Sequence, residues 1–403
     1  MKMTIEDIKK AANNLEGVIH KTALDYSTTF SEISNNDIYL KLENLQRTGS
    51  FKIRGAYNKI ANLSYKEKEY GVIASSAGNH AQGVALAATE YGIDSTIIMP
   101  QGAPIAKVAA TKNYGSQVVL YGSVYDESYL KAQEICQETG ATFISPFNDQ
   151  DIIAGQGTIG LEVIEQLAEL DLILVPIGGG GLISGVALAI KEYNPEVKVI
   201  GVEAENAASM RGSLAKGEII TLDSAATIAD GIAVKKPGSL TYQICQEYID
   251  QIITVTEEEI TKAILMLLER AKLMVEGAGA VTVAALLSQK LNARNKKVVA
   301  VISGGNIDVN MIARIIERGL VKAGRRIKLR TFIEDQPGSL EQLLSKIAHL
   351  EANVISVHHN RYHPKIFIEQ VEVELELETK NNEHSQEIHK ILNQDGYDIQ
   401  LIQ

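Results

Sequence analysis

Residues 172–193, LILVPIGGGGLISGVALAIKEY, place a continuous apolar run, four glycines and an apolar helical pattern in direct succession. An apolar run followed by a helical pattern is the repeating unit of a parallel sheet covered by helices. The same alternation recurs along the chain from residue 38 to residue 324. Its strand-like runs are 37–45, 71–76, 95–100, 116–122, 141–147, 172–181, 197–205 and 296–306. We therefore predict an α/β region whose chemistry lies in the loops at the carboxyl ends of the strands.

The last part of the chain has a different pattern. Residues 327–403 read strand, helix, strand, strand, helix, strand. This βαββαβ order is the ferredoxin-like arrangement, which is antiparallel. We predict a separate module, with the domain boundary near residues 323–327.

Composition excludes several classes of function. The chain has 403 residues, of which 45% are hydrophobic and 22% charged, and its formal net charge of −11 leaves no basic surface for nucleic acid or an anionic membrane. No run reaches the ~18 apolar residues of a membrane span, and the N-terminus lacks the apolar core of a signal peptide. The two cysteines, Cys136 and Cys245, suggest neither a disulfide framework nor a zinc site. We expect a cytoplasmic protein that binds neither nucleic acid nor membrane.

The stretch SFKIRGA, residues 50–56, places Lys52 near the start of a predicted helix, with Ser50 as its N-cap. A helix N-terminus disfavours cations, so a lysine there suggests an amine that is needed uncharged. Gly55 and Ala56 have almost no side chain, so this face of the helix leaves room for a bulky group to lie across it.

Two further helix-opening loops have the composition of anion sites. SSAGNH, residues 75–80, offers hydroxyls, an amide and free backbone N–H groups after a strand. GGGG, residues 178–181, lets the backbone approach a ligand closely and direct several N–H groups at one phosphate.

The glycine loop has a rival interpretation as a dinucleotide fingerprint. Gly179 and Gly181 have the right spacing, and Glu203 follows about 20 residues later. However, Ser184 occupies the third glycine position, and the loop follows the sixth predicted strand instead of the first. A nicotinamide cofactor would also leave Lys52 and SSAGNH unexplained. A phosphate cradle, a reactive lysine and an amino-acid-sized anion site together favour pyridoxal phosphate, whose aldehyde bonds to a lysine and whose ring withdraws electrons.

The chain resembles the threonine dehydratase (threonine ammonia-lyase) group of fold-type II pyridoxal-phosphate enzymes, related to serine racemase and the tryptophan synthase β subunit. The matching stretches, spread over residues 20–320, are LKLENLQRTGSFKIRGA, SSAGNHAQGVA, GQGTIGLE, PIGGGGLISG, VEGAGA and VISGGNID. EDQPGSLEQLLSKIA and NVISVHHNR resemble an ACT domain. The resemblance implies a two-lobed catalytic domain over residues 1–322 and an ACT regulatory domain over residues 327–403.

The same resemblance assigns roles to individual residues. It implies that Lys52 anchors the cofactor covalently and then acts as the general base. It also implies that Asn79 hydrogen-bonds the 3-hydroxyl of the ring and that Ser303 faces the pyridine nitrogen. The cofactor phosphate is expected on Gly178, Gly179, Gly180, Gly181 and Leu182. The substrate carboxylate is expected at Ser76, Gly78 and His80.

The implied reaction is β-elimination of L-threonine to 2-oxobutanoate and ammonia, and of L-serine to pyruvate. The alternatives are a serine dehydratase or racemase of the same fold, a NAD-dependent oxidoreductase, and a non-catalytic amino-acid sensor. Serine racemases carry a serine just before the glycine of the SSAGNH loop, where this chain has Ala77. We therefore expect elimination to dominate over racemisation.

The resemblance also implies regulation. DQPGSL, residues 335–340, has the form of an ACT ligand loop, and isoleucine or valine is the expected effector, although short relatives respond to AMP. A homotetramer is expected. We expect no metal site: Ser209 replaces an acidic ligand of the family's cation site, and the adjacent His358 and His359, with His363 nearby, do not form a ligand cluster.

Overall fold

The computed structural model describes residues 3–361 and 368–402, and the chain divides into two compact units, Met1–Asp308 and Val309–Gln403. The sequence places the boundary after the helix of residues 309–322, whereas the structure groups this helix, α14 (Val309–Lys322), with the C-terminal unit. Helix α14 contacts the strand that follows it, β11 (Arg326–Glu334), and only Ile315 of its side chains is buried. The catalytic and regulatory roles of the two regions stay predictions at this point.

The first unit contains a six-stranded sheet with the order β1-β2-β10-β7-β8-β9. Neighbouring strands are parallel except for the pair β1–β2. The strands are β1 Leu24–Tyr26, β2 Asp37–Lys41, β7 Leu172–Pro176, β8 Lys198–Ala204, β9 Gln251–Val255 and β10 Lys297–Val301. The predicted parallel sheet is confirmed, and the sequence pattern missed only its two edge strands, β1 and β9.

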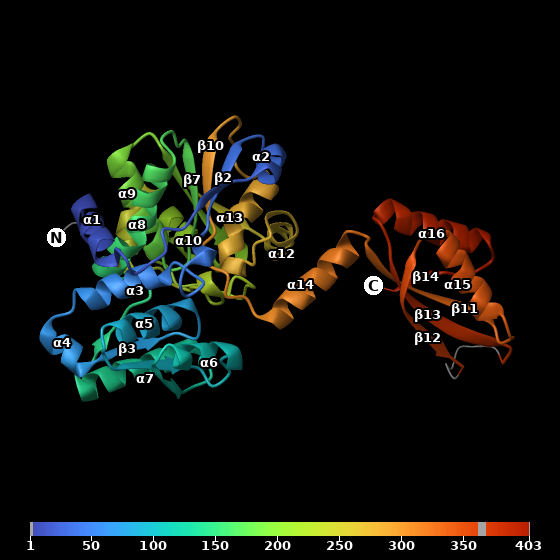
Figure 1. Ribbon diagram of the computed structural model, residues 1–403, viewed down its shortest axis with the longest axis horizontal. Coiled ribbons are helices and arrows are strands. Elements are labelled where there is room, and N and C mark those ends of the chain that lie inside the picture. The colour runs from blue at the N-terminus through green and yellow to red at the C-terminus, as the bar shows by residue number, and fades with distance from the viewer. Residues whose placement is uncertain (1–2, 362–367, 403) are drawn as a thin grey trace. The chain divides into compact units, whose positions relative to one another are not determined.

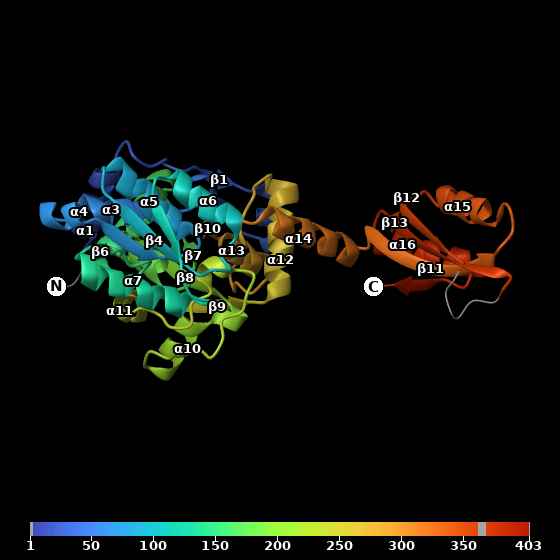
Figure 2. The ribbon, with the colours of Figure 1, turned by 90° about the horizontal axis from the view of Figure 1, so that it is seen from below.

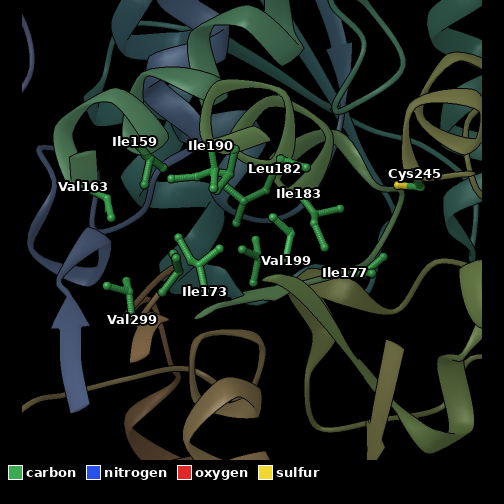
Figure 3. Packing of buried hydrophobic residues seen from close by; sticks show 14 of the residues in the cluster. Ile159, Val163, Ile173, Ile177, Leu182, Ile183, Ile190, Val199, Cys245 and Val299 are labelled. Carbon is green, nitrogen blue, oxygen red and sulfur yellow. The ribbon is translucent and has the colours of Figure 1, made fainter. Parts of the chain in front are cut away.

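Helices cover both faces of this sheet, as its apolar strands require. Helices α8 (Gln150–Gln166) and α9 (Gly181–Tyr193) pack on one face, and α2 (Thr28–Ser34) and α13 (Gly277–Leu287) lie on the other (Figure 1). Between α8, α9 and the strands lies an apolar core, which includes Ile159, Ile183 and Val199 (Figure 3). The remaining helices of this lobe are α1 Ile5–Leu15, α10 Ser209–Lys216, α11 Ser239–Tyr248 and α12 Glu257–Met266.

A second, smaller lobe is built on a four-stranded parallel sheet with the order β5-β4-β3-β6. Helices α3 (Lys52–Ala61) and α5 (Asn79–Glu90) share an apolar core with one face, and α7 (Tyr125–Thr139) packs on the other (Figure 2). The other elements are α4 Tyr65–Tyr70, α6 Ile105–Asn113, β3 Val72–Ser75, β4 Ser95–Met99, β5 Gln117–Leu120 and β6 Thr142–Phe143. The predicted two-lobed region is confirmed.

The C-terminal unit has the predicted βαββαβ order and an antiparallel sheet, β12-β13-β11-β14. Alternate residues of the strands, such as Val371, Val373 and Leu375, pack against two helices. The remaining elements are α15 Ser339–His349, β12 Asn353–Asn360, β13 Gln370–Glu378, α16 Asn382–Gln394 and β14 Gln400–Ile402. His363 lies outside the described residues.

Within residues 3–361 and 368–402, none of the helices combines the length and the apolar character that crossing a membrane requires.

Candidate active site

The loops at the carboxyl ends of both parallel sheets come together around Lys52, the first residue of α3. The backbone N–H of Phe51 donates to the carbonyl of Ser303, which follows β10, over 3.2 Å. The ring of Phe147, which follows β6, lies so close to the glycine loop after β7 that a Cβ on Gly179 would be 2.3 Å from it. Four loops that are far apart in the sequence therefore form one site, as the rule for parallel sheets predicts.

The Lys52 amine donates a hydrogen bond to the carbonyl oxygen of Pro146 over 2.9 Å. Burial lowers the pKa of Lys52 to about 8, and the nearby carboxylate of Glu276 opposes this shift. A depressed lysine pKa agrees with the expectation from the sequence, but the principal cause is desolvation.

The predicted N-cap of α3 is wrong. Phe51 occupies the cap position without a side-chain hydrogen bond, and Ser50 instead forms a β-bridge with Gly304. The bulky neighbour of Gly55 is helix α8: a Cβ on Gly55 would lie 2.7 Å from the carbonyl oxygen of Ile152. Gly55 is therefore required for helix packing.

Asn79, the first residue of α5, has its amide held at both ends. Its Nδ2 donates to Glu276 Oε1 over 2.6 Å, and its Oδ1 accepts from Asn306 Nδ2 over 2.8 Å. One N–H of the Asn79 amide thus stays available for a ligand in the site.

The other residues of the SSAGNH loop differ in what they offer. Ser76 Oγ accepts a hydrogen bond from the backbone N–H of Gly78 over 3.2 Å. The His80 ring is buried, and its Nε2 lies 2.9 Å from the carbonyl oxygen of Ile144. Burial also lowers the pKa of His80 to about 3, so the ring is neutral. His80 can therefore meet a substrate carboxylate only through its backbone.

The glycine loop forms the N-terminus of α9, where Gly180 adopts a left-handed conformation with φ of 94°. The N–H groups of Gly181 and Leu182 open the helix and have no acceptor within it, so they form an anion site. Residues from three segments surround this loop closely: a Cβ on Gly178, Gly179 or Gly180 would lie within 3.0 Å of the Ile232 backbone, the Phe147 ring or the Met210 side chain, respectively. Only glycine backbone fits here.

These residues fit pyridoxal phosphate. The loop provides the phosphate site, Lys52 a buried amine of lowered pKa, and Asn79 an oriented amide. Ser303 is buried, with its hydroxyl donating to the Ala278 carbonyl over a long 3.3 Å. Two further buried hydroxyls, those of Ser50 and Ser75, find no hydrogen-bond partner among the described residues. The polar groups around Lys52 thus have unused hydrogen-bonding capacity.

The dinucleotide interpretation does not fit. Both carboxylate oxygens of Glu203 accept backbone N–H groups, from Met210 and Arg211, each over 2.9 Å. This carboxylate caps α10 and is unavailable to a ribose. Ser209, next to it, has a buried hydroxyl without a partner among the described residues, and those residues contain no group of three side chains suited to a metal ion.

Sequence reasoning missed three residues of the site. Glu276 lies inside the matching stretch VEGAGA, where an acidic residue among apolar and small residues was the available signal. The structure shows that this residue is buried. Pro146 and Phe147 carry no local signal, since only folding brings them to Lys52 and to the glycine loop.

The chain is similar to known proteins over most of its length. A family model described as "Pyridoxal-phosphate dependent enzyme" matches residues 15–304. An L-threonine ammonia-lyase of Thermotoga maritima is 56% identical over 400 residues, which cover 99% of this chain and 100% of the relative. Another, from Geobacter sulfurreducens, is 48% identical over 395 residues, 98% of each chain.

Among solved structures, maize serine racemase matches with a TM-score of 0.75 and 37% sequence identity. The match covers 80% of this chain and 99% of the racemase.

We predict that Gly180→Ala weakens retention of the cofactor about 5- to 150-fold, because a left-handed non-glycine residue costs about 1–3 kcal/mol and a relaxed loop misplaces its N–H groups. Gly102→Ala is the matched control, since a Cβ there meets nothing within 4 Å. Equilibrium dialysis and thermal unfolding of both variants measure the effect. Equal retention in the two variants would contradict the assignment of the loop.

Proposed function

The chain belongs to the family of pyridoxal-phosphate-dependent enzymes, and we infer that it is an L-threonine ammonia-lyase. It catalyses β-elimination of L-threonine to 2-oxobutanoate and ammonia, with L-serine as an expected second substrate that gives pyruvate. The observation that carries this inference is the buried Lys52 amine beside an oriented amide and a glycine loop, in a chain that matches such lyases from end to end.

Pyridoxal phosphate, when bound, supplies an electron-withdrawing ring and a covalent bond to the substrate amine. Lys52 anchors this cofactor, and its Nζ accepts the proton from the substrate α-carbon. A pKa of about 8 suits this role, because an appreciable fraction of the amine is neutral near pH 7. In the structure, the same amine donates to the Pro146 carbonyl.

The other predicted site residues bind and orient. The N–H groups of residues 178–182 hold the phosphate at the N-terminus of α9. Asn79 would hydrogen-bond the ring hydroxyl through its free N–H, and Ser303 would face the pyridine nitrogen with a neutral hydroxyl. Ser76, Gly78 and the backbone of His80 bind the substrate carboxylate at the N-terminus of α5. Because a hydroxyl carries no charge, Ser303 would not hold a proton on the pyridine nitrogen, and the bound ring would then favour elimination.

The C-terminal unit is proposed to regulate the enzyme. Gly338 is the left-handed cap of α15, with φ of 96°, and a Cβ there would meet nothing within 4 Å. The loop 335–340 thus presents the helix N-terminus to small anions such as the carboxylate of isoleucine or valine. A homotetramer and a cytoplasmic location are part of the same proposal.

Lys52→Ala is expected to abolish the visible absorbance of lysine-bound cofactor and to reduce turnover about 10³-fold or more, since both anchor and base are lost. Lys59→Ala, on the same helix, is the control: that lysine pairs with Asp149 and Asp151 and should leave absorbance and turnover unchanged. Spectra and steady-state rates with L-threonine and L-serine provide the test. Undiminished turnover in the Lys52 variant would refute the mechanism.

Elimination should dominate over racemisation because the methyl group of Ala77 cannot donate a proton to the second face of the substrate. Incubation with L-serine should yield pyruvate with little D-serine, measured by chiral chromatography. An Ala77→Ser variant should raise the proportion of D-serine. D-serine formed by the unmodified chain as fast as pyruvate would show that the racemase alternative is correct.

Truncation after Gly324 should keep the cofactor absorbance and turnover but lose any response to isoleucine or valine. Such a response is typically worth 1–3 kcal/mol, or roughly 5- to 150-fold in affinity. In the full-length chain, Gly338→Ala should weaken the response, because the left-handed cap is strained by a side chain. A truncated enzyme that still responds fully would place the effector site in the first unit.

A further inference from the structure

Glu276 is a buried acidic residue at the N-terminus of α13, and none of the roles described above uses it. Its side chain is only 4% exposed, and its backbone N–H donates to the carbonyl of Gly304 over 3.1 Å. A Cβ on Gly304 would lie 2.3 Å from Glu276 Oε1. The glycine therefore leaves the space that this carboxylate occupies.

The carboxylate determines which way the Asn79 amide points. When it is ionised, Glu276 Oε1 can only accept from the Asn79 side chain, so the atom 2.6 Å away is the amide nitrogen. At the other end, Asn306 Nδ2 donates to Asn79 Oδ1 over 2.8 Å and to the Thr48 carbonyl over 2.7 Å. The second N–H of Asn79 is thereby left in a defined direction.

Three charged groups from three elements face Glu276: Lys52 of α3, Lys107 of α6 and Asp230 of the short helix Asp230–Ile232. Burial raises the pKa of Glu276 to about 7; Asp230 adds to this rise, and the two lysines oppose it. Among the described residues, Glu276 is the charged group that raises the pKa of Lys52 against the effect of burial. Each of the two groups thus shifts the pKa of the other in the direction that favours its charged form.

We propose that Glu276 is a positioning residue of this lyase: its carboxylate orients the Asn79 amide toward the cofactor and stabilises the ammonium form of Lys52. The proposal rests on the proposed function. When the α-proton moves to Lys52 Nζ, a positive charge appears in a buried site, and a pre-oriented anion lowers the energy of that state. The proton stays on Lys52; Glu276 neither takes nor gives it.

The test uses the full-length chain, stripped of cofactor and reloaded with pyridoxal phosphate over a range of pH. Only neutral Lys52 attacks the aldehyde, so the rate at which visible absorbance returns has a midpoint at the pKa of Lys52. Glu276→Gln keeps an oxygen for Asn79 and removes the charge. It should lower this midpoint by about one pH unit, the effect of losing one nearby opposite charge.

Glu203→Gln is the matched control, because Glu203 is also buried and its pKa is also raised to about 7, while the carboxylate that acts on the pKa of Lys52 is that of Glu276. Its midpoint should equal that of the unmodified chain. An unchanged midpoint in Glu276→Gln, or the same shift in both variants, would overturn the proposal. No substrate takes part in reloading, so an error in the assigned substrate would appear in threonine kinetics and leave these midpoints unaffected.

Glu276→Asp separates the two parts of the role and carries the test if the glutamine variant does not fold. It keeps the negative charge, but the shorter side chain moves the carboxylate oxygen away from Asn79 Nδ2, and the hydrogen bond between them is lost. The midpoint should stay within about half a pH unit of the unmodified value, while the cofactor dissociates about tenfold faster because a charge-assisted hydrogen bond is lost. A midpoint lowered by a full unit despite the retained charge, or unchanged cofactor dissociation, would contradict the proposal.

Discussion

The buried guanidinium of Arg54 is the constraint on which the position of Lys52 depends. Arg54 is fully buried and forms hydrogen bonds with Glu43 over 2.7 and 2.8 Å and with Glu162 over 2.6 and 3.0 Å. Lys41 adds a second cation, 2.6 Å from Glu162. Two cations and two carboxylates balance each other, and removing one partner of such a set costs about 3–5 kcal/mol. The set joins the end of β2, helix α3 and helix α8, so it holds the helix that begins with Lys52.

Close helix packing reinforces this arrangement. A Cβ on Gly155 of α8 would lie 2.5 Å from the carbonyl oxygen of Arg54, and one on Gly185 of α9 would lie 2.2 Å from that of Ile153. Glycines thus let α8 approach α3 on one side and α9 on the other. Because α3 carries the anchor lysine and α9 begins with the phosphate loop, α8 sets the spacing between the two. The matching stretch GQGTIGLE lies in the middle of this helix.

Burial also prepares the charges of the site. It lowers the pKa of Lys52 to about 8 and that of His80 to about 3, and it raises the pKa of Glu276 to about 7. Desolvation disfavours whichever form is charged, so it acts in opposite directions on bases and acids. The result is a site in which far more of the lysine is neutral at physiological pH than in an exposed lysine, and its neighbouring carboxylate can respond to it. An exposed lysine at the same helix position would lack this property.

The sequence by itself determined what depends on local patterns. Apolar periodicity predicted the alternating elements of both lobes and the βαββαβ unit, and residue types at loop positions predicted Lys52, the SSAGNH loop and the glycine loop. Tertiary structure decided what depends on contacts between distant residues. Ser50 pairs with Gly304 and does not cap α3, the His80 ring turns to Ile144, and Glu276 reaches Asn79 across 197 positions of sequence. Helix α14 groups with the C-terminal unit, although the sequence pattern continues the alternation of the first unit through it. Periodicity is a property of residues that are neighbours in the sequence, so it can be recognised without a structure. Burial and hydrogen-bond partners depend on contacts between distant residues, which form only when the chain folds.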